Sequence, residues 1–122
     1  NDAAYPVVHI IPPEGEYDFS SKYPWLSGGK GSQYICPADI DAETTKAVQA
    51  AALAAHRSLG IEIYSRVDVL LDAQNRPFVL EANTIPGMTE TSLLPKSAAA
   101  AGMPFPELCK MIAELSLPLR GK

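Results

Sequence analysis

One stretch of the chain, from Tyr64 to Ser92, constrains the fold most strongly because it is typical of two β-strands joined by a polar turn. Its first apolar run covers residues 67–71, interrupted only by an aspartate, and its second covers residues 78–80. Both runs are rich in Val, Leu and Phe, which favour strands. Residues 72–76 between them are Asp, Ala, Gln, Asn and Arg, a composition typical of turns. The stretch therefore predicts an antiparallel hairpin.

Four polar side chains occupy these strands at positions where apolar residues are more usual, and they are Arg66, Asp68, Glu81 and Asn83. Because alternate residues of a strand share a face, the first two lie on one face of the first strand and the last two on one face of the second. A four-residue loop over residues 73–76 places Asp68 opposite Glu81. The same register places Arg66 opposite Asn83, and a shift of one residue would separate the two sets.

The opposed carboxylates point to a metal site. Two such groups repel each other, and they take up a proton unless a cation lies between them. Asp68, Glu81 and the amide oxygen of Asn83 are hard ligands, too few to enclose Ca²⁺ but typical of Mg²⁺ sites that phosphates complete. A solvated hairpin face is the alternative for the same residue types. The loop after Asn83, T-I-P-G-M-T, favours chemistry because its backbone N–H groups can stabilise a developing oxyanion.

Two motifs resemble the C-terminal part of D-alanine–D-alanine ligases, within the ATP-grasp superfamily: R-V-D-V-L-L-D at residues 66–72 and F-V-L-E-A-N-T-I-P-G-M-T-E-T-S-L-L-P-K at residues 78–96. The resemblance extends to Y-D-F-S-S-K-Y at residues 17–23 and A-A-A-A-G-M-P-F at residues 98–105, and so covers almost the whole chain. It implies an α+β fold, the C-terminal part of an ATP-grasp domain with a mostly antiparallel sheet and helices packed on one face. Residues 1–122 are then one subdomain, with a mobile loop at about residues 14–32.

The resemblance also implies an activity, the joining of two D-alanines with ATP and Mg²⁺ or Mn²⁺ through an acyl phosphate, for peptidoglycan precursor synthesis. It assigns the metal, and through it the nucleotide, to Asp68, Glu81 and Asn83. It assigns the acyl phosphate and the tetrahedral intermediate to Arg66. The N–H of Gly87 then contributes to the oxyanion site.

Four further residues receive substrate roles from the resemblance. Lys22 in the motif S-K-Y corresponds to the lysine that approaches the γ-phosphate of ATP, although Lys30 would also serve as a phosphate-binding cation on composition alone. Tyr23 belongs to the closing loop, where a tyrosine goes with an amine as the second nucleophile. Ser92 and the N–H of Leu93 are assigned to the carboxylate of the second D-alanine.

Helical periodicity predicts three helices. The first begins after Asp41 as N-cap and ends before Gly60. Its apolar stripe, expected to face a sheet, consists of Val48, Ala52, Ala55 and Leu59. The second helix begins at Ser92 as N-cap and ends before Gly102. The apolar stripe of the third consists of Leu108, Ile112 and Leu115. Short strands are expected at residues 5–11 and 33–36.

Net charge and composition argue against some classes of binding partner. The formal net charge of −4 argues against a nucleic-acid or anionic membrane surface. No apolar stretch approaches the ~20 residues of a membrane span, so a cytoplasmic location is expected. Cys36 and Cys109 are far apart in the sequence and are expected to be free thiols.

The expected partners are D-alanine, ATP and a preceding N-terminal portion of the same enzyme, with a homodimer implied for the complete protein. The chain alone is expected to lack ligase activity, because the family builds much of its nucleotide and first D-alanine sites from preceding segments. Two alternatives remain. One is another ATP-grasp carboxylate–amine ligase, although such relatives usually carry an arginine shortly after the asparagine, where this chain has T-I-P-G-M-T. The other is a non-catalytic fragment that needs a partner.

Overall fold

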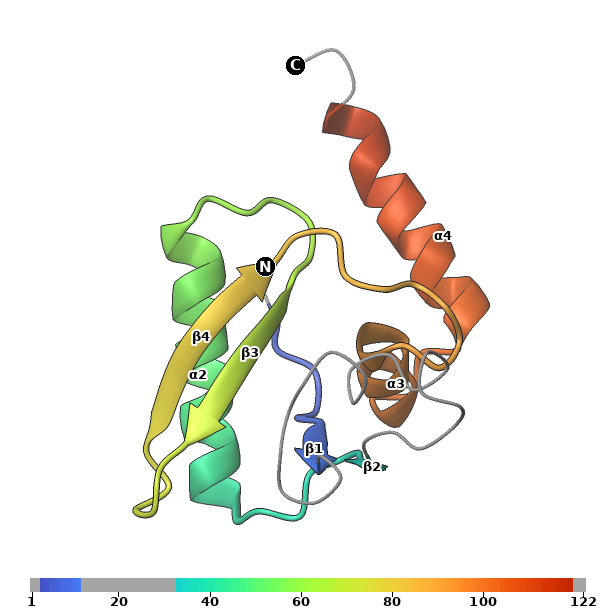
Figure 1. Cartoon of the computed structure of the whole chain (residues 1–122). Helices are drawn as coiled ribbons and strands as arrows, with labels where there is room; N and C mark the ends of the chain where they lie inside the picture. Colours follow the sequence, from blue (N-terminus) through green and yellow to red (C-terminus); the bar gives the residue numbers. More distant parts are fainter. Residues whose placement is uncertain (1–2, 12–32, 120–122) are drawn as a thin grey trace, which may run out of the picture.

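The computed structural model describes residues 3–11 and 33–119. Within these ranges strands and helices both contribute, so the predicted α+β class is confirmed. Figure 1 shows their arrangement. In chain order the elements are β1 (His9–Ile11), β2 (Gln33–Ile35), α2 (Ala42–Ser58), β3 (Arg66–Leu71), β4 (Pro77–Asn83), α3 (Leu93–Ala100), α4 (Phe105–Ser116) and the 3₁₀ helix η3 (Leu117–Leu119).

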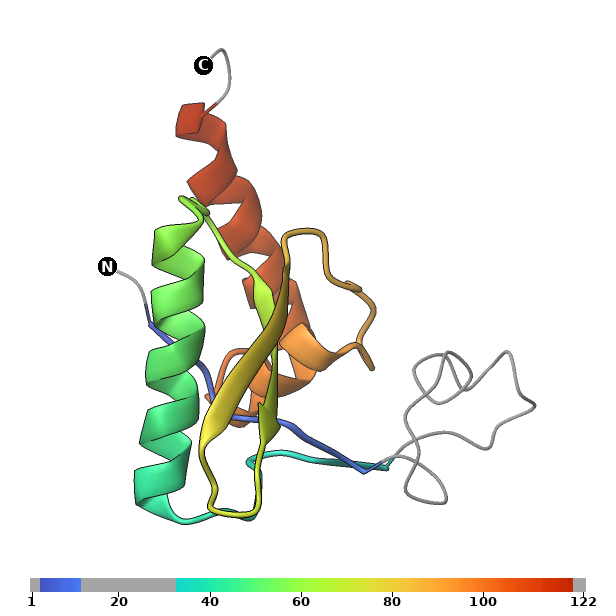
Figure 2. The same ribbon diagram turned by 60° about the vertical axis from the view of Figure 1, so that its left-hand side comes forward.

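The strands form two separate antiparallel pairs, β1 with β2 and β3 with β4. Helix α2 packs along the β3–β4 hairpin and contacts both of its strands. Helices α3 and α4 pack against each other on the β3 side of the hairpin, as Figures 1 and 2 show. Among the described elements, α2 therefore packs on the hairpin, and α3 and α4 pack together beside β3.

The segment before β1 is hydrogen-bonded to both α2 and α3. A strand was expected over residues 5–11, but only His9–Ile11 pair with β2. The carbonyl oxygens of residues 5–7 instead accept hydrogen bonds, in order, from the side chains of Gln49 and Ser97 and from the backbone N–H of Ala38. The bonds from Gln49 and Ser97 tie the segment to α2 and α3, and the bond from Ala38 ties it to the loop before α2.

Helix α2 has the predicted ends. Asp41 accepts a hydrogen bond from the N–H of Thr44 at 2.6 Å, and the bonds from Thr44 lower the pKa of this carboxyl group. Gly60 follows the helix with a φ of +69°, the left-handed conformation that favours glycine there. Val48 is buried as predicted. Leu59, however, is 65% exposed, because it is the C-cap residue beyond the last helical residue.

Helices α3 and α4 form the best-buried part of the described chain. Ala98 is fully buried and Leu108 is 1% exposed, with Pro95 also buried. The predicted stripe of α4 is wrong at Leu115, which is 50% exposed. Figure 1 shows the reason, since the C-terminal half of α4 projects beyond α3.

The expectations about the two cysteines and about membrane-spanning segments can be compared with the structure. Cys36 and Cys109 are both free and half-buried, and burial raises the pKa of the Cys36 thiol, partly offset by the nearby charge of Lys96. No helix within residues 3–11 and 33–119 is long and apolar enough to cross a membrane.

Candidate functional site

The predicted polar pairing in the hairpin is confirmed. Asp68 lies directly opposite Glu81, and Arg66 lies opposite Asn83. The loop that leads to this pairing differs from the expected one. Leu71 pairs with Pro77, so the loop contains five residues instead of four.

A β-bulge in β4 reconciles the longer loop with the predicted pairs. Val69 pairs with Val79, and the next pair is Asp68 with Glu81, which leaves Leu80 as an extra residue in β4. If the pairing had continued regularly from the turn, Asp68 would face Leu80 and Glu81 would face Val67. The bulge therefore brings Glu81 to the face that carries Asp68.

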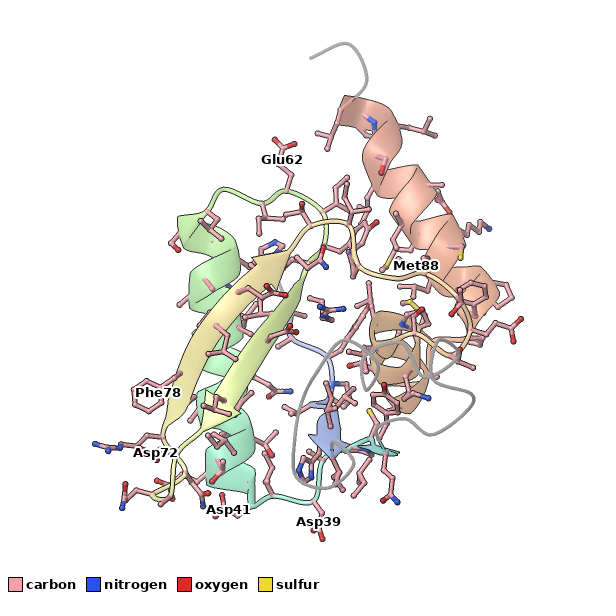
Figure 3. All side chains as sticks on the ribbon, in the orientation of Figure 1. Asp39, Asp41, Glu62, Asp72, Phe78 and Met88 are labelled. Carbon is pink, nitrogen blue, oxygen red and sulfur yellow. The ribbon has the colours of Figure 1, made fainter. Side chains whose placement is uncertain are left out.

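The side chain of Asp72 accounts for the five-residue loop. It accepts hydrogen bonds from the backbone N–H groups of Gln74 at 2.9 Å and Arg76 at 2.8 Å, and from Nε of Arg76 at 2.7 Å. The bond from the Arg76 N–H is the main reason that the pKa of Asp72 is lowered. Asn75 takes a φ of +60° inside the loop, a conformation that asparagine tolerates. Asp72 and Phe78 mark this turn end of the hairpin in Figure 3.

Arg66 supplies a positive charge between the two carboxylates. Its Nε donates to Oδ1 of Asp68 at 2.9 Å and its Nη2 donates to Oδ2 at 3.3 Å. The same Nη2 lies 3.7 Å from Oε1 of Glu81. The side chains of Arg66 and Asp68 are 15% and 22% exposed, which strengthens their interaction, whereas that of Glu81 is 55% exposed. The cation that sequence reasoning placed between these carboxylates is thus, in this structure, a guanidinium group.

The donor set of this face fits a magnesium ion. Each carboxylate has about four lone-pair positions, so Asp68 keeps acceptor capacity beside its two bonds to Arg66. Oδ1 of Asn83 accepts from the N–H of Ile85 at 2.9 Å and retains a second lone pair. Two carboxylates and an amide oxygen remain the hard-ligand set that Mg²⁺ favours. Among the residues that the structure describes, no group of three or more His, Cys, Asp or Glu could hold a metal ion.

The loop after β4 brings Gly87 close to Ser92. A Cβ atom added to Gly87 would lie 2.9 Å from Oγ of Ser92, closer than such atoms pack. Leu93, the next residue, is the first of α3. The three residues assigned to the oxyanion and to the second carboxylate therefore lie at one place, at the N-terminus of α3.

The hydroxyl of Ser92 does not do what an N-cap side chain usually does. Ser92 has the backbone conformation of an N-cap, but its side chain makes no capping hydrogen bond to α3. Its Oγ accepts from the N–H of Thr89 at 3.0 Å and lies 2.8 Å from Oγ1 of the same threonine. Thr89 had received no role from the sequence, although the hydroxyl-rich segment T-E-T-S was the available signal.

Two predicted site residues, Lys22 and Tyr23, lie outside the described ranges, as do Lys30 and the rest of the loop expected at residues 14–32. Their roles remain predictions.

Comparisons with known proteins agree with the resemblance. The family model described as "D-ala D-ala ligase C-terminus" matches residues 1–114. A D-alanine–D-alanine ligase from Methylacidiphilum infernorum is 52% identical over 114 residues, covering 93% of this chain and 36% of the relative. One from Nitratidesulfovibrio vulgaris (strain DP4) is 45% identical over 122 residues, covering 99% of this chain and 39% of the relative.

Solved structures extend this likeness to the fold. The D-alanine–D-alanine ligase of Bacillus anthracis complexed with ATP matches with a TM-score of 0.75 and 35% identity, covering 95% of this chain and 35% of the other. The VanG D-Ala:D-Ser ligase of Enterococcus faecalis matches with a TM-score of 0.71 and 30% identity, covering 91% and 31% of the two chains. The chain thus spans between 31% and 39% of these four proteins, and it belongs to the D-alanine–D-alanine ligase family as the C-terminal part of the ATP-grasp domain.

Proposed function

We propose that this chain is the catalytic C-terminal part of an enzyme that joins two D-alanines into D-alanyl-D-alanine, using ATP and Mg²⁺. One observation carries the proposal. In a chain of this family, Asp68 pairs directly with Glu81, and Arg66 contacts both carboxylates. The proposal includes a cytoplasmic location, a role in peptidoglycan precursor synthesis and a homodimer for the complete enzyme.

The hairpin face holds the metal in this proposal. Asp68, Glu81 and Asn83 would bind Mg²⁺, or Mn²⁺ in its place, against the phosphates of ATP. When bound, the ion supplies positive charge that stabilises the transferring phosphoryl group. Glu81 is the more exposed of the two carboxylates and suits a position next to the nucleotide.

The reaction has two steps. A carboxylate oxygen of the first D-alanine attacks the γ-phosphorus of ATP, and ADP leaves with the electron pair of the broken P–O bond. The guanidinium of Arg66 then holds the acyl phosphate. The second D-alanine, having lost one proton from its ammonium group, attacks the carbonyl carbon through its nitrogen. The N–H of Gly87 donates to the oxyanion. The C–O bond to phosphate then breaks, and the second proton of the attacking nitrogen leaves with the inorganic phosphate.

The remaining residues position the substrates. Ser92 and the N–H of Leu93 bind the carboxylate of the second D-alanine, at the N-terminus of α3, where backbone N–H groups favour an anion. The family resemblance assigns Lys22 to the γ-phosphate and Tyr23 to the closing loop, and the proposal keeps both roles.

The test supplies the portion that the relatives carry before the matched region. The preceding part of the Methylacidiphilum infernorum ligase is joined to this chain, because the two are 52% identical over the shared region. D-alanine-dependent phosphate release is measured, and D-alanyl-D-alanine is identified by mass spectrometry. We expect the fusion to form the dipeptide with ATP and Mg²⁺, and the isolated chain to form none. The intact M. infernorum enzyme is the matched positive control.

Each of the other possible results of this experiment supports one of the alternative functions. A folded fusion that makes no product supports the non-catalytic fragment and contradicts the proposal. A fusion that consumes ATP only with a different carboxylate or amine indicates another ATP-grasp ligase. D-serine is tested as the acceptor, since a relative of known structure is named as a D-Ala:D-Ser ligase.

A further inference from the structure

Thr89 and Ser92 are joined by three hydrogen-bonding contacts. The N–H of Thr89 donates to Oγ of Ser92 at 3.0 Å, and the N–H of Ser92 donates to the carbonyl oxygen of Thr89 at 3.0 Å. The two hydroxyl oxygens lie 2.8 Å apart. The two residues therefore form a closed ring that fixes the position of the Ser92 hydroxyl group relative to the loop.

The bonding capacity of a serine hydroxyl limits what this ring leaves available. Such a group has one proton to donate and two lone pairs to accept with. The Thr89 N–H uses one lone pair of Ser92. The contact between the hydroxyls can run in either direction. If Thr89 donates, both lone pairs of Ser92 are occupied and its proton remains for another acceptor; if Ser92 donates, its proton is used within the ring.

A carboxylate near Ser92 decides this direction. An ionised carboxylate accepts a hydrogen bond about twice as strong as a neutral oxygen does. The Ser92 proton therefore turns toward the carboxylate, and the Thr89 proton turns toward Ser92. Two features support this arrangement: the Ser92 side chain is not used to cap α3, and the close approach of Gly87 restricts the hydroxyl from a second direction.

We propose that Thr89 is a positioning residue for the acceptor site: its N–H and its hydroxyl hold the Ser92 oxygen through both lone pairs, which leaves the one Ser92 proton for the carboxylate of the second amino acid. The inference rests on the proposed function, because that function assigns the carboxylate to Ser92. Thr89 itself does not touch the substrate in this account. Its Oγ1 also lies 3.4 Å from Oγ1 of Thr91, a longer contact than the 2.8 Å to Oγ of Ser92, so we expect its effect on the acceptor site to run through Ser92.

The test compares Thr89→Val, which replaces the hydroxyl with a methyl group, and Thr89→Ser, which keeps the hydroxyl, in the active fusion. For T89V we expect the KM for the second D-alanine to rise about tenfold, because the Ser92 oxygen loses one of the two bonds that hold it toward the carboxylate, with kcat changed less than about threefold. T89S should keep a KM within about twofold of the parent. The matched control is Thr45→Val in α2, the same substitution outside the catalytic loop, which should keep the parental KM.

A double-mutant cycle tests whether Thr89 acts through Ser92. In a Ser92→Ala background, T89V should cause no further rise in KM, because the hydroxyl that it orients is gone. The inference is wrong if T89V keeps the parental KM, if T89S behaves like T89V, if the two substitutions act independently, or if T89V loses its folded circular dichroism spectrum. An inactive parental fusion would instead contradict the proposed function, so the two failures are distinguishable.

Discussion

In the active fusion, Glu81→Gln is expected to lower kcat/KM for ATP at least about 100-fold, on the order of 2.7 kcal/mol of transition-state stabilisation. Glutamine has nearly the same shape as glutamate but lacks the negative charge that holds a divalent cation. Glu81 lies directly opposite Asp68, so its replacement leaves a single carboxylate on this face of the hairpin. D-alanine-dependent phosphate release measures the effect, and raising the Mg²⁺ concentration should restore part of the activity.

The control for this prediction is Glu62→Gln, the same change at an exposed glutamate. Glu62 projects away from the hairpin in Figure 3. We expect E62Q to keep activity within about twofold of the parent, since a surface charge far from the site contributes little. Equal activities of E81Q and E62Q would exclude Glu81 from the metal site.

Leu108→Ala is expected to destabilise the chain by about 2.7–5 kcal/mol. Leu108 is 1% exposed in α4, which packs against α3, so its removal loses apolar burial and leaves a cavity. A loss of that size is a large part of the roughly 5–15 kcal/mol by which a typical domain is stable. Urea unfolding followed by circular dichroism measures it, provided that the slope with denaturant is unchanged.

Leu115→Ala is the matched control, because it removes the same atoms from the same helix at a side chain that is 50% exposed. We expect it to cost less than about 1 kcal/mol. If both variants lose the same stability, the buried contact between α3 and α4 is not the main source of stability in this part of the chain.

Helix ends could be predicted from the sequence because they depend on local chemistry. Asp41 caps α2 through its own side chain, and Gly60 takes a backbone conformation that few other residues adopt. The extent of burial depends on neighbours that are distant in sequence. Leu59 and Leu115 continue the helical periodicity, but Leu59 lies beyond the last residue of α2 and Leu115 lies where α4 projects beyond α3.

The register of the hairpin shows another limit of prediction from the sequence. The pairing of Asp68 with Glu81 was predicted correctly from an incorrect loop, because the five-residue loop and the bulge at Leu80 cancel each other's effect on register. Residues 78–80 are all apolar, so alternation carries no signal about where an extra residue lies.

The candidate site was only partly predictable, because residue types identify possible ligands but not the contacts that the fold creates. Residue types identified Asp68, Glu81 and Asn83 as hard ligands, and the structure places the first two directly opposite each other and the third in the same strand as Glu81. The contact between Thr89 and Ser92 was missed, because a serine before a helix is normally interpreted as a cap, and only the fold of the loop shows its hydroxyl turned toward Thr89.

The position of a bound metal tests the central claim most directly. Crystals of the fusion grown with ATP and Mn²⁺ allow the ion to be located by its anomalous scattering. The account predicts a peak about 2.0–2.2 Å from carboxylate oxygens of Glu81 and from Oδ1 of Asn83, with Asp68 as a further ligand. A Mn²⁺ ion bound with ATP elsewhere, and more than about 4 Å from both Asp68 and Glu81, would contradict it.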